Sequence, residues 1–74
     1  MRSDLRFVGG LDFGFVDPDA FGIILYSTTR PERWVVYEYM QNRIGTAELA
    51  AEIRKGIEYI QTSPLFARVE NKSL

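Results

Sequence analysis

Three apolar stretches near the start of the chain have the pattern of β-strands, at 7–13, 21–26 and 34–40. Within 7–13, alternation places Phe7, Leu11 and Phe13 on one face of a strand and Val8 and Asp12 on the other. Turn formers and polar residues separate the three stretches, with a proline in each connection. Because these connections are short, the pattern predicts an antiparallel meander.

The period of the pattern changes at Thr46 from that of a strand to that of a helix. Four apolar residues then recur at helical spacing, namely Leu49, Ile53, Ile57 and Ile60. This spacing predicts a helix with Thr46 as its N-cap and with Pro64 closing it. The short apolar segment 65–69 predicts a fourth strand, parallel to the first because it returns after a helical crossover. The expected fold is α/β, with the order β-β-β-α-β.

Composition limits what the chain can bind. Its 74 residues predict one domain at most, spanning 1–74, and a net charge of -1 differs from the dense basic surface of a free-standing DNA-binding domain. The chain has neither cysteine nor histidine, so any metal must be held by oxygen ligands, which favours magnesium, calcium or manganese over zinc. No apolar run approaches the roughly 20 residues of a membrane span, so the cytoplasm is the expected compartment.

Asp12 is the sharpest candidate for chemistry, because strands usually avoid aspartate. A carboxylate on a central strand costs desolvation free energy unless a cation or a donor meets it. One interpretation is a metal site, since carboxylates hold the paired divalent ions of phosphodiester hydrolysis about 4 Å apart. The other is that Asp12 bonds to the following turn or is exposed on a solvated face.

The strongest motif consists of two neighbouring segments, Gly10-Leu11-Asp12-Phe13-Gly14 and Asp17-Pro18-Asp19-Ala20. They resemble the opening strand and turn of the nuclease domain of phage terminase large subunits, where Gly-x-Asp-x-Gly is followed by Asp-Pro and a small residue. The third strand, the first helix and the next acidic strand of that family resemble Val36-Tyr37-Glu38-Tyr39, Gly45-Thr46-Ala47-Glu48 and Phe66-Ala67-Arg68-Val69-Glu70. The resemblance covers about 7–70 and implies a partial RNase H-like domain.

This resemblance implies that Asp12 is the first metal ligand and Glu70 the second, holding Mg²⁺ or Mn²⁺. It also implies duplex DNA as the partner, bound through a full-length DNA-packaging protein in a phage-infected or prophage-bearing cell. Enzymes of this class carry a third carboxylate further downstream, and no Walker A segment is present. We therefore expect a fragment with weak metal affinity and poor or no catalysis.

Four further acidic residues compete for a role. Glu48 is expected to favour the positive end of the helix dipole, although it can also face the site. Glu38 shares its predicted strand face with Trp34, Val36 and Met40 and is interpreted as structural. Asp17 and Asp19 are interpreted as turn residues, with Asp17 also able to support the site from its edge.

Rival interpretations come from other classes. An actin-like or sugar-kinase ATPase also opens with Asp-x-Gly, but two aspartates and Pro18 make a poor phosphate cradle. A RuvC-like resolvase shares the strand order and would cut a four-way junction. A non-catalytic module is the third alternative. Under each interpretation, unpaired sheet edges predict a homo-oligomer.

Overall fold

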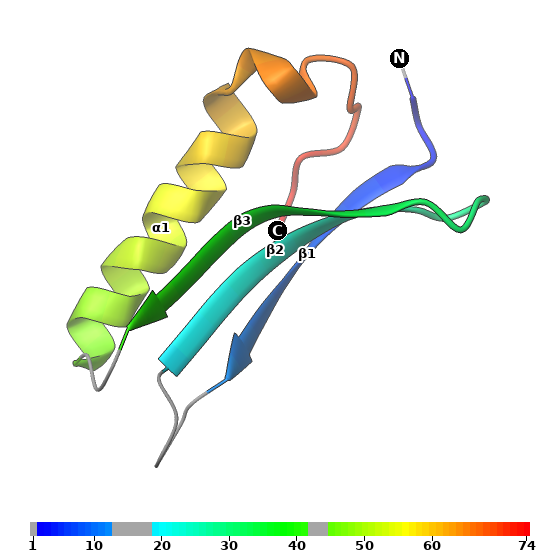
Figure 1. The fold of residues 1–74 in the computed structure, drawn as a ribbon. Helices are drawn as coiled ribbons and strands as arrows, with labels where there is room; N and C mark the ends of the chain where they lie inside the picture. The colour runs from blue at the N-terminus through cyan, green and yellow to red at the C-terminus, as the bar shows by residue number, and fades with distance from the viewer. Residues whose placement is uncertain (1, 13–18, 42–44) are drawn as a thin grey trace.

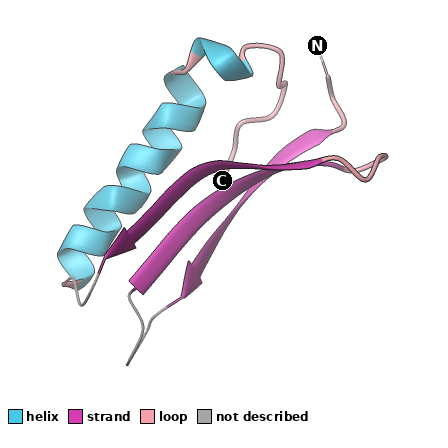
Figure 2. Cartoon of the chain, viewed as in Figure 1, coloured by secondary structure: helices cyan, strands magenta, loops and turns pink. Residues whose placement is uncertain are grey.

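The chain forms a three-stranded sheet with one long helix packed against it, as seen in a computed structural model that describes residues 2–12, 19–41 and 45–74 (Figures 1 and 2). The strands are antiparallel and lie in the order β1-β2-β3, which confirms the predicted meander. The elements are β1 (Leu5–Asp12), β2 (Asp19–Ser27), β3 (Arg33–Gln41), α1 (Thr46–Thr62) and the 3-10 helix η1 (Pro64–Phe66).

Each strand is longer than its apolar run, because backbone pairing continues past the last apolar side chain. The β1–β2 ladder extends from Leu5 opposite Ser27 to Asp12 opposite Ala20. The interpretation of Asp19 as a turn residue is therefore wrong. Asp19 is the first residue of β2, lies opposite Gln41 of β3, and is buried.

Every second residue of β2 is buried, and the apolar side chains among them form the centre of the core. Phe21, Ile23 and Leu25 are buried on the face that meets α1, where they join Leu49 and Ile60 of the helix. Burial of these side chains against a helical stripe supplies most of the folding free energy in so small a chain. The helical spacing read from the sequence is confirmed by this packing.

Gly56 allows α1 to approach the sheet closely. A Cβ atom at this position would lie 2.9 Å from ring carbons of Tyr37 and 3.2 Å from Cδ1 of Ile23. Such contacts are too short for any other residue, so the glycine in mid-helix has a packing reason despite its low helix propensity. Tyr37 also packs edge-on against Phe21, with ring centroids 6.1 Å apart.

A β-bulge in β3 changes which side chains share a face. Tyr37 pairs with Ile23, but Val35 pairs with the next residue, Ile24, so Val36 is the extra residue. Beyond the bulge the alternation is reversed, and Trp34 lies opposite the buried Leu25. The prediction that Trp34 and Val36 share a face with Glu38 is therefore wrong, since a bulge cannot be read from a regular alternation.

The helix begins and ends close to the predicted residues, but with different caps. Gly45, and not Thr46, is the N-cap, and it makes no side-chain capping bond. Glu48 lies in the first turn, where a negative charge is favoured by the helix dipole. At the other end, the Ser63 N–H donates to the Tyr59 carbonyl at 2.9 Å. No described helix has the length and apolar character to span a membrane.

The segment after α1 does not form the predicted fourth strand within the described residues. Pro64 starts η1, and the Ser63 hydroxyl accepts the Leu65 N–H at 3.2 Å, which favours a tight turn over an extended chain. Phe66 then packs edge-on against Phe7, with centroids 5.4 Å apart. One isolated parallel bridge, between Arg2 and Val69, brings the segment beside the start of β1.

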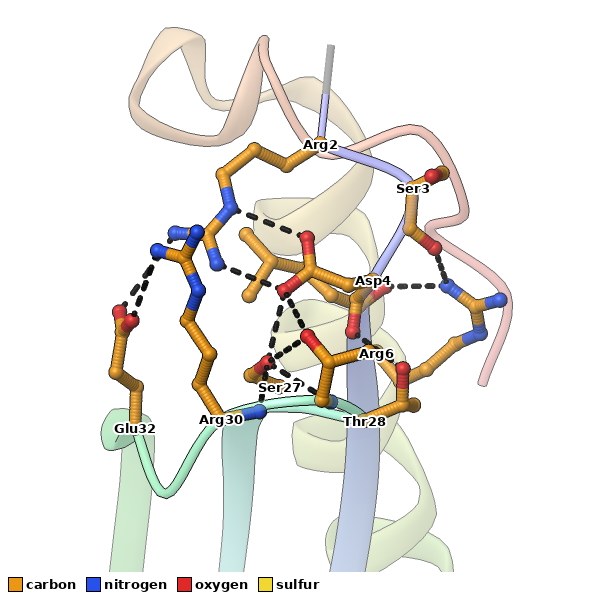
Figure 3. Close-up of polar contacts among 10 residues, drawn as sticks. Arg2, Ser3, Asp4, Arg6, Ser27, Thr28, Arg30 and Glu32 are labelled. Carbon is orange, nitrogen blue, oxygen red and sulfur yellow. Dashed lines mark hydrogen bonds and ion pairs between the residues drawn. The ribbon is translucent and has the colours of Figure 1, made fainter.

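A cluster of polar contacts ties the N-terminal residues to the β2–β3 turn (Figure 3). The Arg2 guanidinium donates to both Asp4 carboxylate oxygens, at 3.1 and 2.7 Å, and the Ser27 hydroxyl donates to Asp4 Oδ2 at 2.8 Å. These donors, Arg2 first, hold the pKa of Asp4 well below its usual range. Ser27 Oγ also accepts the Arg30 N–H at 3.0 Å, which fixes the turn.

Candidate functional site

The sheet has one face that α1 covers and one that no described element covers (Figure 1). The register of the strands arranges the uncovered side chains in four cross-strand rows. From the start of β1 to its end, these rows are Arg6–Tyr26–Arg33, Val8–Ile24–Val35, Gly10–Gly22–Glu38 and Asp12–Ala20–Met40. We call this surface the open face.

Asp12 lies on the open face at the last position of β1, opposite Ala20, and is exposed. The prediction that it shares a face with Val8, opposite Phe7 and Leu11, agrees with the register. Its side chain borders a hollow of about 320 Å³ that Gly10 and Gly22 also line. Two adjacent residues without side chains leave this part of the sheet surface unfilled.

Glu38 is a second acidic residue among those that line the same hollow. It lies on β3 across from Gly22, which in turn pairs with Gly10, so only Gly22 lies between it and β1. The sequence pattern had indicated a structural role for Glu38. Only the cross-strand register reveals that Glu38 and Asp12 line the same hollow. The register of Glu38 depends on the β2–β3 turn and on the bulge in β3.

The structure does not bring Asp12 and Glu70 together. The Glu70 N–H donates to the Arg2 carbonyl at 3.4 Å, which places this residue beside the chain that precedes β1. Asp12 lies at the opposite end of that strand, and eight residues of strand span about 23 Å. A shared ion needs carboxylate oxygens within about 2–2.5 Å of it, so the two residues do not co-ligate in this register.

The remaining acidic candidates lie elsewhere. Glu48 is exposed in the first turn of α1, and the helix packs on the other side of the sheet. Asp19 alternates with Phe21 on the covered face and is buried. Asp17 lies outside the described residues.

The donor set of the hollow suits a hard cation that keeps most of its water. Asp12 and Glu38 offer carboxylate oxygens only, and magnesium is commonly held by one or two carboxylates together with several waters. Among the residues that the structure describes, no group of three or more metal-ligating side chains gathers at one place. Asp12 and Glu38 are the two carboxylates of a hollow whose lining is otherwise mainly apolar.

Comparisons of the chain with protein-family models, with curated proteins and with solved structures find no match.

Proposed function

We propose that this chain is the opening portion of an RNase H-like, metal-dependent DNA endonuclease domain, of the kind that phage terminase large subunits use in DNA packaging. Asp12 is the first metal ligand in this proposal. Asp12 is exposed on the edge strand β1, so desolvation does not demand a cation there. The observation that carries the proposal is its place beside a hollow that two glycines leave open.

The order of elements supports the proposal. An antiparallel meander is followed by a helix on one face of the sheet, and the chain after the helix returns to the free edge of β1. The Arg2–Val69 bridge has the parallel sense that a fourth strand of the proposed fold requires. The returning segment thus pairs with the chain that leads into the strand that carries Asp12.

The chemistry of the hollow is compatible with phosphodiester hydrolysis. A divalent ion, when bound, supplies an activated water and neutralises charge on the phosphate. Asp12 would hold this ion and Glu38 would attract it from the opposite wall. Since the net charge of the chain is -1, we assign the main duplex-binding surface to other parts of a longer protein.

We propose Glu70 as the second ligand in a different register, in which its segment lies beside the C-terminal half of β1. Such a shift would remove Val69 from the core and break the Phe66–Phe7 contact, so metal binding would have to compensate for both. The segment contacts the chain before β1 through the Arg2 N–H to Arg68 carbonyl bond of 2.9 Å and the bond from Glu70 to Arg2. Metal binding near Asp12 would favour the shifted register by attracting the Glu70 carboxylate.

Titration of the chain with Mn²⁺, followed by amide NMR broadening and by calorimetry, tests the proposal. We expect broadening centred on Asp12 and a loss of affinity of at least about tenfold in Asp12→Asn. Glu58→Gln is the matched control, because Glu58 is exposed on α1 and its loss should leave the affinity unchanged.

Two further variants test whether Glu70 or Glu38 binds the ion together with Asp12. Weaker binding in Glu70→Gln, together with broadening at 69–71, supports the shifted register. Weaker binding in Glu38→Gln alone places the ion over the two glycines. Unchanged affinity in Asp12→Asn would remove the metal site and with it the nuclease proposal.

A further inference from the structure

The open face carries a continuous apolar row across the whole sheet. Val8, Ile24 and Val35 lie side by side on the three strands, and their exposed fractions are 48%, 38% and 66%. Met40 adds a fourth exposed apolar side chain on β3, at 58%. Large apolar side chains that adjoin one another on a sheet favour a contact that removes them from water.

The row of residues next to this apolar row contains two glycines, which leave room for apolar side chains of a second molecule. The next row along the strands is Gly10–Gly22–Glu38, and the hollow of about 320 Å³ lies there. If a second open face is turned so that its strands run in the opposite direction, the apolar row of each copy meets the glycine row of the other. Val8 then lies over Gly10 of the second copy, and Ile24 over Gly22.

The charges of the open face select the same orientation. Arg6 and Arg33 lie in the row at one end of the face, and Asp12 and Glu38 lie in the last two rows at the other. With opposed strand directions, Arg6 of each copy faces Asp12 of the other. On β3, Arg33 lies over Met40, one row from Glu38, and Val35 lies over Glu38. The other face-to-face two-fold arrangement places Arg6 over Arg33, where like charges repel.

We propose that the open face is a homodimer interface, in which two copies pack sheet to sheet around a two-fold axis that runs across the strands. The contact is isologous, so each apolar row and each charged end is used twice. The sheet has a flat footprint of roughly 400 Å², about half of what a stable interface buries on each partner. The dimer is therefore weak and depends on concentration.

Sedimentation equilibrium over a wide range of chain concentration, in EDTA, tests the dimer. We expect a reversible monomer–dimer equilibrium with a dissociation constant above about 1 µM. Ile24→Lys places a charge in the middle of the apolar row and should raise that constant at least about tenfold. Leu65→Lys is the matched control, since Leu65 is 76% exposed on η1 and lies away from the open face, and it should have no effect.

The same variant distinguishes this face from pairing at the sheet edges. Ile24 lies on the central strand β2, so a charge there does not block an edge. A dimer that persists in folded Ile24→Lys and in Val35→Lys, or a chain that is monomeric at every concentration, would overturn the proposal. Circular dichroism establishes that each variant is folded.

Arg6→Asp tests the orientation by the sign of its effect. In the proposed dimer the introduced carboxylate would face Asp12 of the second copy, so the dissociation constant should rise. In the alternative arrangement it would face Arg33, and the constant should fall. Adding Asp12→Arg to Arg6→Asp exchanges the charges within one chain and should restore the dimer. Failure of the double variant to do so, while it remains folded, would contradict the charge pairing.

The dimer goes beyond the proposed nuclease function and can fail separately. Sedimentation in EDTA reports association without metal. The neutral variant Val8→Asn changes the apolar row at a residue that does not line the hollow, so it leaves Asp12 and Glu38 undisturbed for the Mn²⁺ titration. Lost association with intact metal affinity in that variant is the expected result. Loss of both would show instead that the variant has disturbed the sheet.

Discussion

The two faces of the same sheet differ in what their side chains do. On the covered face Phe21, Ile23 and Leu25 are buried beneath α1 and hold the fold together. On the open face the intervening residue Ile24 is exposed, at 38%, within a row of apolar neighbours. Adjacent isoleucines of one strand thus serve different purposes, one stabilising the monomer and the other available for contact with a second molecule.

This comparison shows that apolar character alone does not define a core. Both faces of β2 carry large aliphatic side chains, yet only one face has a helix to bury them. A sheet that is apolar on both faces usually has cover on both. The unbalanced cover of this sheet is the physical basis for the proposed dimer, and the variants below test the difference between the faces.

The largest effect on stability should come from truncating the buried Ile23, and the same truncation of its neighbour Ile24 provides the comparison. Ile23 is fully buried, so Ile23→Ala should lower the free energy of unfolding by about 2–5 kcal/mol, through lost transfer free energy and the cavity left behind. Ile24→Ala should cost less than about 1 kcal/mol in the monomer. Urea denaturation at low chain concentration measures both. Equal losses would mean that the open face is buried in the monomer.

A smaller effect is expected from adding one methyl group on each side of the sheet, at Gly56 of α1 or at Gly10 of the open face. Gly56→Ala forces a Cβ to within 2.9 Å of the Tyr37 ring, and overpacking should cost about 1–3 kcal/mol, more than the roughly 1 kcal/mol gained in helix propensity.

Gly10→Ala is the companion variant on the open face. No atom lies within 4 Å of the added Cβ, so the folded state accepts it. The free energy of unfolding should rise slightly, because the unfolded chain has less conformational freedom with alanine than with glycine. The methyl group fills part of the hollow, so the dimer should weaken. Thermal melts and sedimentation measure the two effects. A stabilised Gly56→Ala would show that the helix–sheet contact is looser than described.

The smallest effect concerns acid and the polar cluster at the end of the sheet. Donors from Arg2 and then Ser27 hold the pKa of Asp4 below its ordinary value of 3.8. This stabilisation is therefore fully present above pH 3.8 and is lost as the pH falls below it toward the lowered pKa of the folded state.

Thermal midpoints across this acid range provide the measurement for Asp4. The midpoint of the parent chain should fall more steeply with acid than that of Asp4→Asn, which has no carboxylate to protonate at this position. Glu58→Gln should keep the parent's slope, because its carboxylate is exposed on α1. Parallel curves for the parent chain and Asp4→Asn would contradict the role of the cluster.

Much of the fold could be predicted from local pattern. Alternation identified the three strands and the face of Asp12, and helical spacing identified α1 from Thr46 to Thr62. Two predictions failed for different reasons. The bulge at Val36 changed the face of Trp34 and depends on pairing with the distant strand β2, whereas η1 replaced extended chain through the local Ser63–Leu65 bond and Pro64.

Less of the candidate site than of the fold could be predicted from the sequence. Asp12 stood out because a carboxylate is unusual within a strand. Its neighbour Glu38 did not, since the two are 26 positions apart and meet only through the register of β2. The prediction for Glu70 assumed that its segment runs beside the end of β1, whereas the Arg2–Val69 bridge fixes a different register.

The sequence by itself determined the first three strands, the long helix and their order, because periods of two and of 3.6 residues are local properties of the chain. Tertiary structure alone decided which apolar face is buried, which side chains lie across from one another, and where the last segment meets β1. These depend on register and on helix placement, which are set by contacts between residues far apart in the chain and are invisible to any local pattern.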